Sequence, residues 1–96
     1  MDLGTATLET FEPCVGDAFT LSADGASVEL VLHSALAIGE WPGGRQPFSL
    51  AFRGPAEPLL PQATYGLEHA ELGAFHLFIV PIGRDSGGTL YEAVIT

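Results

Sequence analysis

The chain has 96 residues, which is the size of one domain around one hydrophobic core and leaves no room for two. Hydrophobic residues make up 47% of it, and 12 Asp and Glu stand against 3 Lys and Arg, for a formal net charge of −9. This charge repels phosphate backbones and anionic lipids, which disfavours nucleic acid and membrane surfaces as partners. No run approaches the roughly 20 apolar residues that span a bilayer, and no signal peptide is evident. We therefore expect synthesis and folding in the cytosol.

The first predicted element is a short helix. Leu8 and Phe11 are three residues apart, the spacing of one helical face, and the sequence around them predicts a helix over residues 5–12. Residues 15–38 then hold two apolar runs separated by "ADGA", which predicts a hairpin with its turn at Asp-Gly. The following "GEWPGGRQP" is so rich in Gly and Pro that it predicts a loop.

The second half of the chain predicts four more strands. "FSLAFRG", residues 48–54, alternates cleanly between apolar and other side chains and predicts a strand. "GPAEPLLPQ" carries three prolines and predicts a stiff connector. "ATYGLEHA" and "LGAFHLFIVPIG" predict two strands, the second of which is expected to end at Pro81 and Gly83 and to be covered on both faces. "RDSGG" predicts a turn, and "TLYEAVIT" predicts the final strand.

No predicted helix is long enough to connect parallel strands, so the six strands must pair mainly antiparallel. We predict an all-β single domain over residues 1–96, a small six-stranded antiparallel barrel whose one short N-terminal helix plugs an end. A two-sheet sandwich is the alternative. The predicted core consists of Phe48, Leu50, Phe52, Leu67, Phe75, Leu77, Phe78, Val80 and Val94.

Side chains that could carry chemistry gather at "YGLEHAEL". Glu68 and His69 are neighbours on a strand and point to opposite faces, so they cannot bind one metal ion together. We therefore predict no metal, no cofactor and no catalytic residue here, only a strand end and a turn at "EHAEL". A metal-dependent enzyme that uses His69, Glu71 and His76 is one rival hypothesis. Cys14, among apolar neighbours, is predicted to be a small buried hydrophobe and not a nucleophile.

Other polar residues on the predicted strands have structural interpretations. His33 and His76 occupy similar strand positions and would share a pH-sensing face if their strands paired. Glu29 and Glu92 lie in the middle of strands, which predicts a structural ion pair with Arg53 as the expected cation.

The loop "GEWPGGRQP" is the best predicted contact with a partner. It carries Trp41 and Arg45, two residue types that are over-represented at interface hot spots. Packing of Trp41 as a lid over the barrel is the alternative. A second rival function is a small-ligand or carbohydrate-binding barrel whose mouth holds Trp41, Tyr65 and His69.

The segments "FSLAFRGP", "LPQATYGLEH", "LGAFHLFIVPIG" and "YEAVI", in this order and preceded by "VGDAF", cover nearly the whole chain. Together they resemble a family of small uncharacterised bacterial all-β proteins. The resemblance implies an accessory role in a bacterial assembly, because neighbouring genes of some members encode phage-tail-like collar proteins. We therefore expect a non-enzymatic accessory or protein-interaction domain with unidentified protein partners, among which a second copy of the chain is one alternative.

Overall fold

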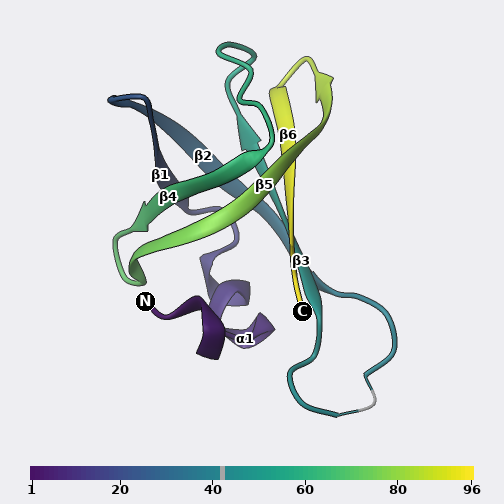
Figure 1. Ribbon diagram of the computed structural model, residues 1–96. Coiled ribbons are helices and arrows are strands. Elements are labelled where there is room, and N and C mark those ends of the chain that lie inside the picture. Colours follow the sequence, from purple (N-terminus) through teal and green to yellow (C-terminus); the bar gives the residue numbers. More distant parts are fainter. Residues whose placement is uncertain (42) are drawn as a thin grey trace.

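The computed structural model describes residues 1–41 and 43–96 and is dominated by six antiparallel strands. These strands are β1 (Ala18–Ala23), β2 (Ala26–Ala37), β3 (Phe48–Gly54), β4 (Ala63–His69), β5 (Gly73–Asp85) and β6 (Gly88–Ile95). They follow one another in the order β1-β2-β3-β6-β5-β4, and β4 pairs again with β1, so the sheet closes on itself (Figure 1). We call this closed sheet the β-ring. The predicted all-β class and the single closed antiparallel sheet are confirmed, and the sheet is not a two-sheet sandwich.

Alternation along each strand directs every second side chain into the β-ring. In β3, Phe48, Leu50 and Phe52 are fully buried, as the sequence predicts. Inside the β-ring the aromatic rings meet edge to face. The centroid of the Phe19 ring lies 5.4 Å from that of Phe52 and 6.2 Å from that of Phe75, and the ring planes are 81° and 89° apart. The interior of the β-ring is therefore a packed core.

A short helical segment closes one end of the β-ring (Figure 1). It consists of a 3-10 turn (Leu3–Thr5), α1 (Leu8–Phe11) and a second 3-10 turn (Glu12–Cys14). Phe11 is fully buried, with its ring 5.8 Å from the ring of Phe48 and 6.0 Å from that of Phe75. The helix is shorter than the predicted residues 5–12. In the described part of the chain, no helix is both long and apolar enough to cross a membrane.

The Pro-rich connector between β3 and β4 closes the opposite end. Leu60 in this connector is buried, and its N–H donates to the hydroxyl of Tyr91 at 3.0 Å inside the core. Burial removes the Tyr91 hydroxyl from water, and this hydrogen bond replaces the one that water would make. The connector is thus part of the core as well as a link.

Three members of the predicted core lie elsewhere. Phe78 and Val94 are 52% and 54% exposed, and Val80 is only partly buried. The inward side chains of β5 and β6 are instead Phe75, Leu77, Ile79, Tyr91, Ala93 and Ile95. The prediction that residues 75–80 are covered on both faces is therefore wrong, because the outer face of the β-ring meets solvent.

The predicted end of β5 is also wrong. The strand continues through Pro81 and Gly83 to Asp85, with a register shift between Pro81 and Gly83 that marks a β-bulge. A bulge interrupts the regular ladder and so accommodates a residue that lacks an N–H donor.

Candidate functional site

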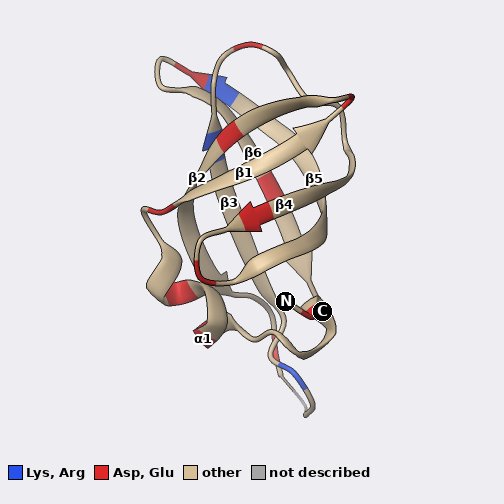
Figure 2. Cartoon of the chain, turned by 90° about the vertical axis from the view of Figure 1, so that its left-hand side faces the viewer, with Lys and Arg blue, Asp and Glu red and all other residues tan. Residues whose placement is uncertain are grey.

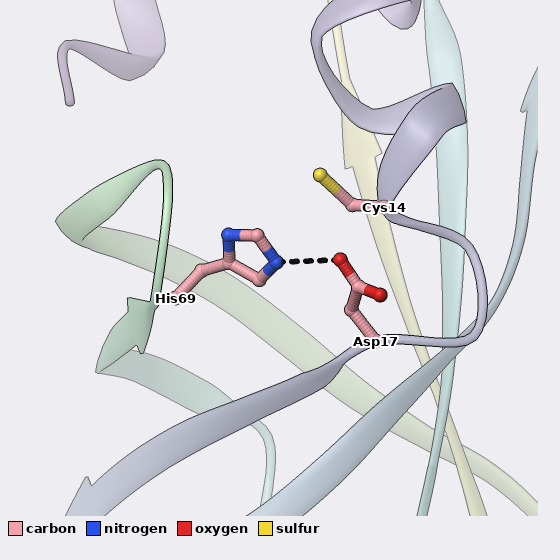
Figure 3. A group of neighbouring side chains, drawn as sticks. All are labelled: Cys14, Asp17 and His69. Atoms are coloured by element: carbon pink, nitrogen blue, oxygen red, sulfur yellow. Dashed lines mark hydrogen bonds and ion pairs between the residues drawn. The ribbon is translucent and has the colours of Figure 1, made fainter.

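A cluster of side chains that could bind a metal ion or take part in a reaction lies at the α1 end of the β-ring (Figure 3). It contains Cys14, Asp17 and His69, and one potential ligand atom of each lies within 4.8 Å of the others. His69 is the last residue of β4 and faces inward, so that it is only 4% exposed. The sequence drew attention to His69 and Cys14 but missed Asp17, because 52 residues separate this aspartate from the histidine.

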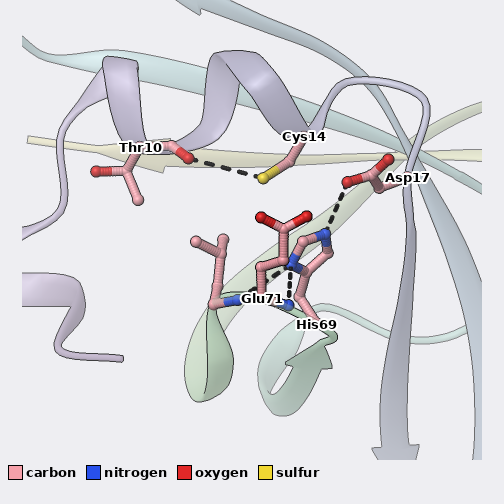
Figure 4. A network of polar contacts seen from close by, with 6 residues as sticks. Thr10, Cys14, Asp17, His69 and Glu71 are labelled. Carbon is pink, nitrogen blue, oxygen red and sulfur yellow. Dashed lines mark hydrogen bonds and ion pairs between the residues drawn. The ribbon is translucent and has the colours of Figure 1, made fainter.

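The hydrogen bonds of His69 assign its proton to one ring nitrogen. Nδ1 accepts from the N–H groups of Glu71, at 3.1 Å, and Leu72, at 3.2 Å (Figure 4). A nitrogen that accepts carries no proton, so the neutral ring holds its proton on Nε2, which donates to Oδ2 of Asp17 at 2.9 Å. The ring also packs on Phe19, with a centroid distance of 4.6 Å. His69 therefore fastens the β4–β5 turn to the residue that precedes β1.

This geometry does not suit a metal ion. A histidine that binds a metal usually donates its second ring N–H to a nearby acceptor. In His69 the second nitrogen, Nδ1, faces two donors instead, and the proton on Nε2 is directed at Asp17. His76, which the metal-enzyme hypothesis requires, is exposed on the outer face of β5, whereas His69 points inward. The side chains of that hypothesis do not converge.

Cys14 is not arranged as a nucleophile either. It is buried, and its thiol donates to the carbonyl oxygen of Thr10 at 3.7 Å (Figure 4). Burial, followed by the nearby carboxylates of Asp17 and Glu71, raises the pKa of Cys14 above its ordinary value. Because the thiolate is the reactive form, a raised pKa makes the thiol inert at neutral pH. The predicted burial of this cysteine is confirmed.

The β2–β3 loop contains Pro42, which lies outside the described residues, between the predicted contacts Trp41 and Arg45. The Trp41 side chain is 55% exposed, and its Nε1 donates to the carbonyl oxygen of Gly44 at 2.6 Å, so it is not a lid. Arg45 donates to main-chain oxygens of Leu3, Gly4, Ala6 and Thr96. The guanidinium of Arg45 is therefore engaged within the chain, while the indole of Trp41 stays open to solvent.

Tyr65 lies away from the other predicted contacts. It faces inward on β4, and its hydroxyl donates to the carbonyl oxygen of Pro61, in the connector, at 2.6 Å. His69 lies instead at the α1 end. Tyr65 and His69 are therefore not arranged around one mouth with Trp41, as the ligand-binding hypothesis requires.

Charged residues on the outer face pair differently from the prediction. Arg53 Nη1 lies 2.7 Å from Oδ1 of Asp85, whereas Glu92 accepts a hydrogen bond from the hydroxyl of Ser49 at 3.2 Å. The expected ion pair of Arg53 with Glu29 or Glu92 is wrong. Acidic residues are spread over strands and turns and do not gather on one face (Figure 2).

The strands that carry His33 and His76 do not pair in the described β-ring. His33 lies on β2, which pairs with β1 and β3, and His76 lies on β5, which pairs with β4 and β6. The two histidines therefore do not form a shared pH-sensing face.

An apolar stripe on the outer face is a feature that the sequence analysis missed. Phe78 on β5, Val94 on β6 and Leu36 on β2 are 52%, 54% and 61% exposed. Val94 pairs with Ser49 and Ser49 with Leu36. On the other side of β6, Val80 pairs with Glu92, and these two residues are each two positions from Phe78 and Val94 along their strands. We call Leu36, Ser49, Val94 and Phe78 together the outer stripe. It crosses four neighbouring strands of the β-ring.

Comparison with known proteins identifies the family. A family model described as "Domain of unknown function (DUF6916)" matches residues 6–95. The chain belongs to this family. The matched DUF6916 region includes α1, the second 3-10 turn and all six strands, so these elements belong to one family domain. Searches of curated proteins and of solved structures find no match.

Proposed function

We propose that this domain is a non-enzymatic protein-interaction domain that binds its partner through the outer face of the β-ring. The observation that carries the proposal is the outer stripe, where three large apolar side chains, on β2, β6 and β5, are more than half exposed on the outer face. Contiguous exposed apolar surface framed by polar residues is typical of protein-binding sites. Aromatic residues such as Phe78 are enriched in the centres of such interfaces.

The interior supports a protein partner over a small ligand. A small-ligand site needs a concave pocket into which a few polar groups converge. The inside of the β-ring is filled by aromatic and aliphatic side chains, with Phe11 at one end and Leu60 at the other. Carbohydrate or small-ligand binding inside the β-ring is therefore the less supported alternative, and so is a metal-dependent enzyme built on His69.

We propose a bacterial assembly as the setting of this interaction, and specifically a phage-tail-like one; the resemblance of the sequence to small bacterial proteins supports this proposal. Under this proposal the domain is an accessory component that contributes binding surface. A second copy of the chain is one candidate partner, and a different protein is the other.

The test is capture of the partner from the native host by wild-type protein and by two matched variants. Phe78→Ser removes the aromatic ring from the outer stripe, whereas Ile82→Ser removes an equally exposed apolar side chain from the same strand outside the stripe. Loss of a central aromatic contact should weaken capture by about 2 kcal/mol, roughly thirty-fold. Equal capture by both variants would contradict the proposal.

A third variant tests the loop that the sequence favoured. Trp41→Ala removes the exposed indole, which should cost about 1–2 kcal/mol of binding if the β2–β3 loop contacts the partner. Capture that requires Trp41 but not Phe78 would move the interface from the outer stripe to the loop.

A further inference from the structure

A hollow lies on the outer face of the β-ring at Gly66. This glycine on β4 pairs with Ser22 on β1 and with His76 on β5, so the three residues stand in one row across the sheet. Because Gly66 has no side chain, a hollow of about 200 Å³ opens between Ser22 and His76. Glu68, two residues along β4, points to the same face and also lines the hollow.

Glu68 gives this hollow a negative charge. Its side chain is exposed and forms no ion pair within residues 1–41 and 43–96. Of the positive groups of the chain, Arg45 and Arg84 bind main-chain oxygens, Arg53 binds Asp85, and the N-terminal ammonium of Met1 donates to the carbonyl oxygen of Ala74, which also lines the hollow. With a formal net charge of −9, the chain as a whole also attracts cationic partners. The carboxylate of Glu68 is therefore available to a cationic group of another molecule.

The hollow lies beside Phe78 of the outer stripe. Thr64, in the row next to Gly66 on β4, pairs with Phe78 on β5. Phe78 is also two residues from His76 on the same face of β5. A protein that covers the exposed ring of Phe78 therefore lies within side-chain reach of Glu68.

We propose that the hollow at Gly66 receives an arginine side chain of the partner, whose apolar side chains cover the outer stripe. The planar guanidinium of arginine can bind the carboxylate of Glu68 through two parallel hydrogen bonds and can stack on the ring of His76. This inference rests on the proposed function and adds the chemistry that the partner presents: an arginine beside apolar residues.

A peptide titration followed by NMR tests the inference without the native partner. The probe is acetyl-Leu-Arg-Leu-amide, and its matched control carries citrulline, an uncharged isostere, in place of arginine. The arginine peptide should cause saturable shifts of the backbone amides of residues 64–68 and 76–78. The citrulline peptide should bind three- to five-fold more weakly, roughly the contribution of one exposed ion pair.

Three variants of the chain complete the experiment. Gly66→Val fills the hollow, and the fold tolerates a Cβ there because its nearest neighbour, Nε2 of His76, would be 3.8 Å away. This variant should lose the saturable shifts. Glu68→Gln keeps the shape and should bind the arginine peptide as weakly as the wild type binds the citrulline peptide. Glu29→Gln, which removes an exposed carboxylate from β2, should bind like the wild type.

The inference is overturned by any of three results: shifts that do not saturate, equal binding of both peptides, or unchanged binding by Gly66→Val and Glu68→Gln. The capture experiment separates this outcome from failure of the proposed function. Partner capture that depends on Phe78 but not on Glu68 leaves the proposed function in place and removes the arginine contact.

Discussion

Replacement of His69 by alanine tests whether this histidine is a structural tie and not part of a reactive site. The substitution removes a ring that is 4% exposed and packs on Phe19. It also removes the two hydrogen bonds that Nδ1 accepts in the β4–β5 turn and the one that Nε2 donates to Asp17. The substitution therefore removes both bonds that hold the turn to the end of β4 and the one bond that ties it to the start of β1.

The expected loss follows from these contacts. Each net hydrogen bond is worth about 1 kcal/mol, and loss of the buried ring adds roughly 1–2 kcal/mol of packing. Asp17 is partly exposed, so its hydrogen bond with Nε2 contributes less than a buried one. We therefore expect His69→Ala to lower the free energy of unfolding by about 3–4 kcal/mol. That is a large part of the 5–15 kcal/mol by which a domain is typically stable.

Two milder variants divide this loss. In His69→Asn, the amide oxygen can take the place of Nδ1 and accept from the N–H groups of Glu71 and Leu72. This variant should therefore lose about 2 kcal/mol less than His69→Ala. Asp17→Ala breaks only the bond to Nε2 and should cost about 1 kcal/mol.

Urea unfolding followed by circular dichroism measures all three variants. A loss below about 1 kcal/mol for His69→Ala would refute the structural role, since it is smaller than one hydrogen bond and the packing together. Equal losses for His69→Ala and His69→Asn would refute the assignment of Nδ1 as an acceptor.

Four further predictions follow from burial, charge and hydrogen bonding. Phe52→Ala should lower the free energy of unfolding in urea by about 3–5 kcal/mol because Phe52 is fully buried. Phe78→Ala, at a side chain that is 52% exposed, should lower it by less than about 1.5 kcal/mol. A larger loss for Phe78→Ala than for Phe52→Ala would show that the inward and outward faces of β5 are assigned wrongly. Arg45→Lys should cost about 2 kcal/mol, since one ammonium cannot reach every carbonyl that the guanidinium binds, while Arg84→Lys, which loses one exposed contact, should cost less than about 0.5 kcal/mol. Burial raises the pKa of Cys14, so the folded state holds the thiol proton to higher pH than the unfolded state does. The stabilisation from this proton is present below the unfolded pKa and is lost as pH rises through the folded pKa. In urea unfolding at increasing alkaline pH, the free energy of unfolding should therefore fall more steeply for the wild type than for Cys14→Ala, and equal slopes would contradict this. Chelator should leave the melting temperature unchanged and added zinc should not raise it, and a zinc-dependent rise would mean that the Nε2 proton is displaced by metal.

The alternation of side chains predicted most of the fold. Residues 48–54 have apolar side chains at every second position, and that period of two can be satisfied only by a strand with one buried face. The "ADGA" turn likewise specified the hairpin of β1 and β2. Local signals of this kind were sufficient for the number of strands and for their antiparallel pairing.

The inward faces of β5 and β6 were harder to predict, because both faces of each strand carry large apolar residues. Alternation alone cannot then decide between Phe78 and its neighbour Ile79. The polar residues held the missing information. His76 shares a face with Phe78, and Glu92 shares a face with Val94. A face that carries ionisable side chains is expected to meet solvent.

The contacts at the candidate sites could not be read from the sequence because they join distant segments. The His69 to Asp17 bond spans 52 residues, and Arg45 reaches Thr96 across 51 residues. Nothing near either residue in the sequence specifies such a partner. Pairing of β4 with β1 brings His69 to Asp17, and pairing of β3 with β6 brings Arg45 to Thr96. The sequence therefore pointed to the right histidine without showing what it binds.

Hydrogen–deuterium exchange on the captured complex tests most directly the central claim, that a protein partner covers the outer face of the β-ring. Binding should slow the exchange of amides in β5 and β6 around Phe78 and Val94, and in β4 around Gly66, relative to the free chain. Protection confined to the α1 end around His69, with unchanged exchange in β5 and β6, would contradict the account.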